Sequence, residues 1–115
     1  MIIPKQWHIY IVDLEPRVRT KPGKQRPCLS IQPNEFGLNG LDSTVVLPII
    51  TNLINNAFPL RVRIQKEMAG LHKGSDIITD QILAWDNSLF QSEIGQLPDF
   101  LMDETKLALQ DFLDL

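Results

Sequence analysis

The chain has 115 residues, 43% hydrophobic and 22% charged, which is typical of one globular domain and excludes a disordered chain. No apolar run is as long as a membrane-spanning helix, and the N-terminus lacks the apolar core of a signal peptide. The net charge of −3 is uneven, because residues 1–74 hold ten of the eleven Lys and Arg residues but only five of the fourteen acids. This segregated charge still allows a nucleic-acid-binding protein.

The first half of the chain predicts three strands. Residues 7–14 are rich in β-branched and aromatic side chains, as strands are. A polar loop with its turn at Pro22-Gly23 leads to a second short strand over residues 27–32. The third strand covers residues 43–50, and residues 51–56 predict a turn or a single helical turn.

The second half predicts further strands. Residues 58–64 alternate apolar and polar side chains, which indicates a half-buried strand with Arg61 and Arg63 on a basic outer face. Residues 75–85 predict a strand pair or one bent strand, which contains Asp80 and Gln81, and residues 89–94 predict another strand.

Only the end of the chain predicts a helix, from Pro98 onward. Its expected apolar face consists of Leu101, Ala108, Leu109, Phe112 and Leu115. About six short strands followed by one helix predict a mainly β fold with a C-terminal helix. We expect a small, strongly bent sheet or partly open barrel over residues 1–115, with the helix packed on one side.

Few side chains suggest a bound group. The sequence has no Gly-rich phosphate loop, no Cys or His pair at zinc spacing and no carboxylate cluster, so we expect neither a metal nor a cofactor. The single cysteine, Cys28, lies in an apolar run, which favours a buried structural thiol and a reducing, cytoplasmic location. His8 or His72 could act as a base only if the fold brought it to a site.

Arg26 and Thr51 are the strongest candidates for a reactive site. Arg26 stands at the mouth of the second strand and Thr51 at the end of the third, so the two can meet in space. The planar guanidinium suits phosphate oxygens, and the hydroxyl can position a neighbouring group. The pair suggests phosphoryl transfer without a metal.

A run of basic residues leads into Arg26. The basic residues of this run are Arg17, Arg19, Lys21 and Lys24. Two interpretations remain open: a solvated loop, or a surface that binds nucleic-acid phosphates.

A resemblance is carried by several segments in this order: Tyr10-Ile11-Val12-Asp13-Leu14-Glu15-Pro16, a charged loop, Gln25-Arg26-Pro27-Cys28-Leu29-Ser30-Ile31, Leu47-Pro48-Ile49-Ile50-Thr51, Phe58-Pro59-Leu60, Thr79-Asp80-Gln81-Ile82 with Trp85-Asp86, Ile94-Gly95-Gln96-Leu97-Pro98 and a terminal helix. The chain resembles the MazF/PemK family of toxins from bacterial toxin–antitoxin modules. The resemblance implies a small SH3-like barrel of the CcdB/MazF type, a homodimer and a cognate antitoxin. It also implies metal-independent, sequence-specific cleavage of single-stranded RNA through a 2′,3′-cyclic phosphate, with Arg26 and Thr51 acting on the scissile phosphate. The RNA-binding residues that it implies are Arg17, Arg19, Thr20, Lys21, Lys24 and Gln81.

The chain departs from the family pattern at a few positions. Arg19-Thr20-Lys21-Pro22 replaces the usual Gly-Ser-Glu-Gln of the first loop, and Leu83 stands where an arginine is common. Ile78 occupies a position where one branch has an arginine thought to be catalytic. Two alternatives therefore remain: a CcdB-like toxin of the same fold that poisons gyrase, or a catalytically weak relative that acts through its antitoxin complex.

Overall fold

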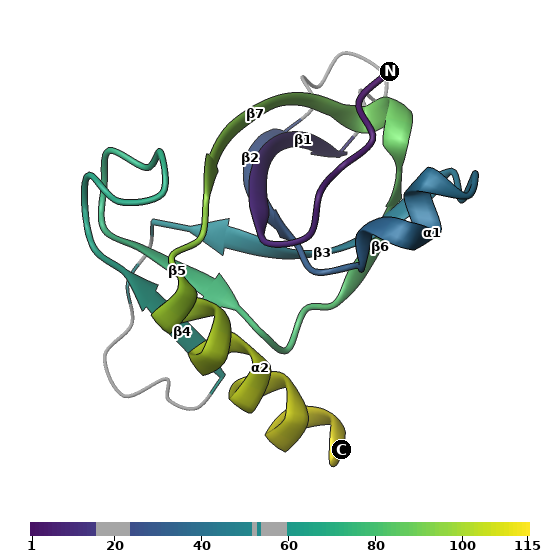
Figure 1. Ribbon diagram of the computed structural model, residues 1–115. Coiled ribbons are helices and arrows are strands. Elements are labelled where there is room, and N and C mark those ends of the chain that lie inside the picture. The colour runs from purple at the N-terminus through teal and green to yellow at the C-terminus, as the bar shows by residue number, and fades with distance from the viewer. Residues whose placement is uncertain (16–23, 52, 54–59) are drawn as a thin grey trace.

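A computed structural model describes residues 1–15, 24–51, 53 and 60–115 (Figure 1). Its strands are β1 (His8–Glu15), β2 (Lys24–Ser30), β3 (Ser43–Ile50), β4 (Arg61–Ile64), β5 (Ser75–Ile78), β6 (Leu83–Asp86) and β7 (Phe90–Gln96). Its helices are α1 (Asn34–Leu38), the single 3₁₀ turn η1 (Asn87–Leu89) and α2 (Asp99–Leu113).

The strands form one antiparallel sheet that curls but does not close, as Figure 1 shows. Their order is β4-β5-β3-β2-β1-β7, and β6 pairs with β3 outside this path. One edge of β3 pairs first with β6 and then, at Ile49 and Ile50, with β5. The other edge pairs with β2. The prediction of a mainly β fold with a C-terminal helix is confirmed.

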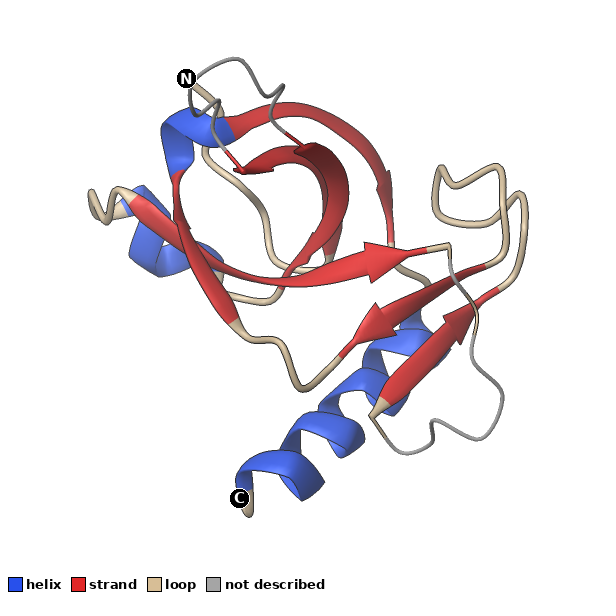
Figure 2. Ribbon diagram, turned by 180° about the vertical axis from the view of Figure 1, so that it is seen from behind, coloured by secondary structure: helices blue, strands red, loops and turns tan. Residues whose placement is uncertain are grey.

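Alternate residues of the strands build two cores. On one side of the sheet, residues such as Leu47, Ile49 and Ile77 are buried against α2, which lies along β4 and β5 in Figure 2. On the other side, the curl of β1, β2 and β7 encloses a smaller cluster of Tyr10, Val12, Cys28, Val46 and Phe90. Because the strands are pleated, β1, β2 and β3 contribute alternate residues to both cores.

The predicted strands agree with the structure to different degrees. The third strand is confirmed residue for residue. The second begins three residues earlier than expected, because Pro27 lies within β2 opposite Ile11 instead of opening the strand. Residues 75–85 form two strands, yet each pairs with β3 and not with the other.

Two short helices were not predicted. A five-residue helix such as α1 is too short to show a helical pattern of apolar residues, and Gly37 lies within it. The 3₁₀ turn η1 falls where a turn was expected at Asp86-Asn87. Residues 58 and 59, and the expected turn after Thr51 apart from Leu53, lie outside the described residues.

The prediction for the apolar face of α2 is only half right. Leu101, Thr105 and Ala108 are buried against the sheet. Phe112 and Leu115, however, are 46% and 87% exposed. The reason is geometric: the last turns of α2 project beyond the sheet (Figure 1).

Two glycines allow β7 to touch the connection between β4 and β5. A Cβ at Gly95 would lie 2.0 Å from the carbonyl oxygen of Ala69, and one at Gly70 would lie 1.9 Å from that of Ile94. Gly70 also has a φ of +83°, which favours glycine. These backbones approach more closely than any side chain would permit.

We expect Gly95→Ala to lower the free energy of unfolding by about 3 kcal/mol, because two backbone segments would have to separate. Gly40→Ala is the matched control: Gly40 has a φ of +100° but open space around its Cα. The control should cost only about 1 kcal/mol, the backbone strain. Urea unfolding of both variants measures the difference, and equal losses would contradict the close approach.

Candidate functional site

Arg26 and Thr51 lie at the same end of the sheet. The pairing of β2 with β3 runs antiparallel and ends at Cys28↔Pro48. Arg26 is two residues beyond this pair on β2. Thr51 is three residues beyond it along the chain and directly follows the end of β3. Arg26 is half-buried and Thr51 is exposed. The fold therefore brings the two predicted reactive residues to one end of the β2–β3 ladder.

The environment of Arg26 confirms the interpretation of Cys28. Arg26 pairs with Val12, and Cys28 pairs with Tyr10, so the arginine and the thiol are on the same side of the sheet. Burial raises the pKa of the Cys28 thiol to about 12, and the charge of Arg26 opposes this only in part. The thiol is protonated at neutral pH, as expected of a structural cysteine and not of a nucleophile.

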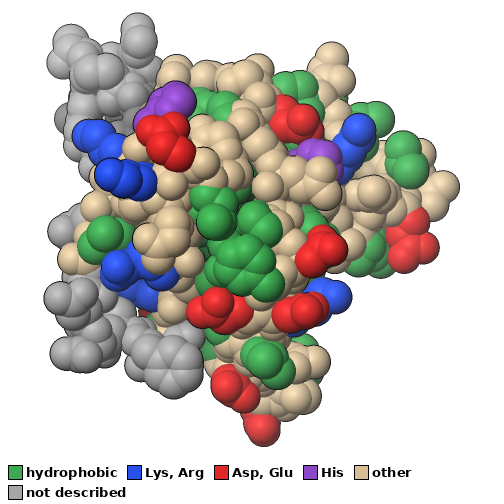
Figure 3. Space-filling view, turned by 60° about the vertical axis from the view of Figure 1, so that its left-hand side comes forward, with side chains coloured by type: hydrophobic (Ala, Val, Ile, Leu, Met, Phe, Trp, Pro, Cys, Tyr) green, Lys and Arg blue, Asp and Glu red, His purple; other side chains and the backbone are tan. Residues whose placement is uncertain are grey.

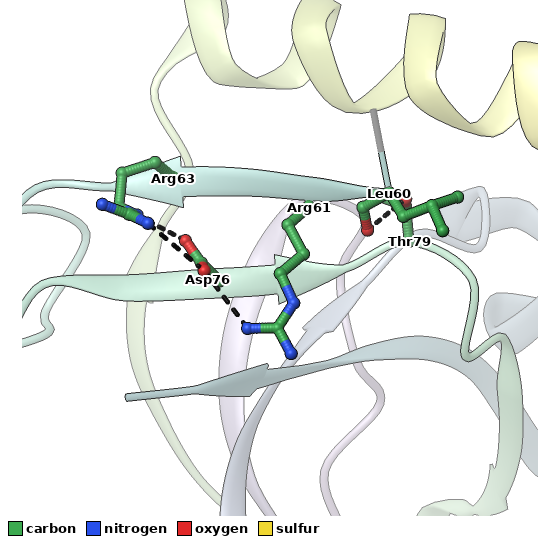
Figure 4. A network of polar contacts seen from close by, with 5 residues as sticks. All are labelled: Leu60, Arg61, Arg63, Asp76 and Thr79. Atoms are coloured by element: carbon green, nitrogen blue, oxygen red, sulfur yellow. Dashed lines mark hydrogen bonds and ion pairs between the residues drawn. The ribbon is translucent and has the colours of Figure 1, made fainter. Parts of the chain in front are cut away.

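A buried ion-pair network lies next to this end of the sheet (Figure 4). Asp76 pairs with Ile50, the residue before Thr51, across β5 and β3. Its carboxylate accepts hydrogen bonds from Arg63, through Nε at 2.5 Å and Nη2 at 3.5 Å, and from Arg61 Nη1 at 3.4 Å. The sequence predicted the basic outer face of β4, and the alternating burial of Arg61–Ile64 confirms it. The acidic partner was missed, because a sequence does not reveal strand register.

Of the predicted RNA-binding residues, the structure describes Lys24 and Gln81. Arg17, Arg19, Thr20 and Lys21 lie outside the described residues. Lys24 opens β2, where its backbone pairs with Glu15. The role of these residues in RNA binding stays a prediction.

Gln81 is exposed in the connection between β5 and β6. The prediction that Asp80 and Gln81 lie in a strand is therefore wrong. Ile49 pairs with β5 and Val46 with β6, so this connection runs beside the middle of β3, away from the end that Thr51 follows. The chain turns at Asp80 because β5 and β6 occupy successive stretches of the same β3 edge.

A second polar cluster joins β1 to β7. His8 Nδ1 lies 2.8 Å from Glu93 Oε1, and the Tyr10 hydroxyl donates to the same oxygen at 3.1 Å. Burial raises the pKa of Glu93, but its hydrogen bonds to His8 and Tyr10 outweigh this and hold the pKa below its usual range. Val12, the partner of Arg26, is four residues along β1 from His8, or about 13 Å. His8 is therefore not within hydrogen-bond reach of Arg26 in the same chain.

Charge is partly segregated on the surface. In Figure 3, several Lys and Arg side chains gather on the left of the view and several Asp and Glu side chains lie toward the bottom, with further acidic side chains at the upper left, the top and the right. The exposed acids of α2 are Asp99, Asp103, Glu104 and Asp111. Within the described part of the chain, no group of three or more His, Cys, Asp or Glu residues could hold a metal ion. None of the helices described is long and apolar enough to cross a membrane.

Comparison with solved structures identifies the class of fold. The toxin MazF-mt6 of Mycobacterium tuberculosis superimposes with a TM-score of 0.77 over 94% of this chain and 97% of its own, at 22% identity. The MazE–MazF complex (Form-II) of Deinococcus radiodurans gives a TM-score of 0.82 over 100% of this chain and 99% of the other, at 17% identity. The fold is that of the MazF toxins.

Sequence comparison gives the family. Residues 5–113 match the family described as PemK-like, MazF-like toxins of type II toxin–antitoxin systems. The chain is 35% identical over 115 residues to endoribonuclease EndoA of Bacillus subtilis (strain 168), covering 99% of this chain and 97% of that protein. The chain belongs to the PemK/MazF toxin family.

We expect Glu93→Gln to destabilise the protein above about pH 5 and to have little effect once the pH falls below the folded pKa of Glu93. A carboxylate whose folded pKa lies below the usual 4.5 stabilises the fold above that value, and the benefit is lost as pH falls through the folded pKa. For a half-exposed group the loss is at most about 1 kcal/mol. Thermal unfolding across pH, with Glu104→Gln on α2 as control, measures this. A pH-independent difference would contradict the role of the Glu93 charge.

Proposed function

We propose that this protein is the toxin of a toxin–antitoxin module and acts as a metal-independent, sequence-specific endoribonuclease on single-stranded RNA. The observation that carries the proposal is that Arg26 and Thr51 lie at the same end of the β2–β3 ladder. Family membership and the 35% identity to endoribonuclease EndoA support it. The same family match favours this function over gyrase poisoning.

The proposed reaction needs no nucleophile from the protein. The 2′-hydroxyl oxygen of the RNA attacks the adjacent phosphorus, the bond to the 5′-oxygen breaks, and the product carries a 2′,3′-cyclic phosphate. The leaving 5′-oxygen takes up a proton and the 2′-hydroxyl loses one.

Arg26 stabilises the negative charge that grows on the phosphorane oxygens, and Thr51 orients the phosphate through its hydroxyl. The half-buried position of Arg26 favours this role, because a preorganised donor acts more strongly where water is partly excluded. Cys28 takes no part, since its thiol stays protonated at neutral pH.

RNA binding in this proposal is mostly electrostatic. Arg17, Arg19, Lys21 and Lys24 precede the catalytic Arg26 in sequence, and with Thr20 they contact the RNA that passes over this end of the sheet. Gln81, beside the middle of β3, reads a base further along the strand.

Two protein partners complete the proposal. The first is a second copy of the chain: the edge strands β4 and β7 and the apolar side chains of Phe100 and Leu107, both 62% exposed, gain by burial in a homodimer. The second is a cognate antitoxin, whose acidic segment would lie over the basic end of the sheet. Similar folds were solved as MazE–MazF complexes, and a mycobacterial endoribonuclease was solved with its cognate antitoxin.

The proposed toxin is a single domain over residues 1–115 and works in the cytoplasm, where its RNA substrate is found. A buried free thiol at Cys28 fits that reducing compartment.

The direct test is incubation of the purified protein with a mixed-sequence single-stranded RNA in EDTA. We expect cleavage at a short recurring sequence and 2′,3′-cyclic phosphate ends. Gyrase inhibition without cleavage would support the CcdB-like alternative, and inactivity in both assays would indicate a catalytically weak relative.

We expect Arg26→Ala to lower the cleavage rate at least about a hundredfold, as loss of one preorganised donor does. Arg26→Lys should not restore the rate, because an ammonium lacks the bidentate fork. Thr51→Ala should cost less, and Thr51→Ser should be nearly silent. Single-turnover cleavage measures these rates. A folded Arg26→Ala protein that cuts at the wild-type rate would refute the assignment.

A further inference from the structure

Asp76 of β5 joins two arginines of β4, Arg61 and Arg63. Asp76 is 1% exposed, and its carboxylate is held between two guanidinium groups. A buried carboxylate requires such partners. Both guanidinium groups donate to this one carboxylate.

Arg63 keeps donors that Asp76 does not use. Its guanidinium has five N–H donors, of which the edge formed by Nε and Nη2 is used on Asp76. Among the described residues, no other side chain accepts a hydrogen bond from Arg63. Its side chain is 38% exposed, against 18% for Arg61. The donors of the opposite edge therefore face solvent while the carboxylate holds the group in place.

Strand register puts Arg63 on the same side of the sheet as Arg26. Arg63 pairs with Asp76, Asp76 with Ile50, and Cys28 with Pro48. Paired residues and residues two apart on a strand share a side. Alternate residues of the same strands are buried against α2. The side that carries Arg26 and Arg63 is thus the one away from α2 and its acids.

The separation suits one extended ligand. Arg26 and Arg63 lie on β2 and β4, with β3 and β5 between them. Three strand spacings correspond to about 14 Å, too far for one phosphate and within reach of a short run of nucleotides. A strand of RNA that places one phosphate at Arg26 can place another at Arg63.

We propose that Arg63, fixed by Asp76, binds a backbone phosphate of the RNA other than the scissile one. This inference rests on the proposed endoribonuclease function and adds a second phosphate site to it. A guanidinium already held on one edge loses little conformational freedom when its other edge binds a phosphate. Asp76 and Arg61 act as positioning residues.

The test uses a fully 2′-O-methylated, mixed-sequence single-stranded RNA, which lacks the attacking hydroxyl. Three variants are compared with the wild type. Arg63→Gln removes one positive charge from the proposed site. The double variant Arg63→Gln/Asp76→Asn leaves the net charge unchanged and replaces the ion pair by a neutral one. Lys106→Gln removes one positive charge from α2, on the opposite side of the sheet.

We expect Arg63→Gln to weaken binding about tenfold, as loss of a charged hydrogen bond does. The slope of log affinity against log salt should fall by roughly 0.7, the value for one phosphate contact with a single strand. The double variant should show the same loss although its net charge is that of the wild type. Lys106→Gln should retain wild-type affinity and slope. Urea unfolding checks that all variants are folded.

Each other outcome overturns the inference. If the wild type cleaves RNA and the double variant binds it like the wild type, Arg63 belongs to a structural ion pair only, and the proposed function stands. If the wild type neither binds nor cleaves RNA, the proposed function fails with it. If poly-glutamate binds better than RNA and Arg63→Gln abolishes that binding, the site takes an acidic protein segment instead.

Discussion

The arrangement of the whole molecule depends on the pairing of one strand, β3. Its first half pairs with β6, its last residues pair with β5, and β2 pairs along the other edge. A strand that changes partner along its length must bend, since neighbouring strands in a twisted sheet diverge. That bend separates the sheet into a curled part around Tyr10 and Cys28 and a flatter part under α2. It also leaves the end of β3, with Thr51, next to both β2 and β5.

The position of the polar groups near this end also follows from the change of partner along β3. Because Asp76 pairs with Ile50 on the side away from α2, its carboxylate is buried where Arg61 and Arg63 of the neighbouring strand reach it. Removing either arginine would leave the buried charge poorly compensated, whereas surface ion pairs contribute little to stability. The basic residues of β4 are therefore part of the fold and, in our account, part of the RNA-binding surface as well.

Sequence patterns predicted those features of the fold that depend only on the residues of a single strand or helix. Residues 43–50 and the outward position of Arg61 and Arg63 follow from local composition and alternation, and both are confirmed. Asp80 and Gln81 were misplaced, because the turn between β5 and β6 is imposed by the shared edge of β3 and not by local turn residues. Asp76 was missed as a partner of the arginines for a related reason: cross-strand contacts depend on register. Arg26 and Thr51 were predicted to meet from their places at strand ends, which needs only antiparallel pairing.

The central claim is that RNA crosses the end of the sheet at Arg26 and Thr51 and runs over the side away from α2. The most direct measurement is a backbone-amide NMR titration of the ¹⁵N-labelled protein with the 2′-O-methylated RNA. We predict shift changes concentrated at residues 24–28, Thr51, residues 61–63 and Asp76, with the amides of α2 unaffected. Shift changes confined to α2, or to α1 and the strand that follows it, would contradict the account.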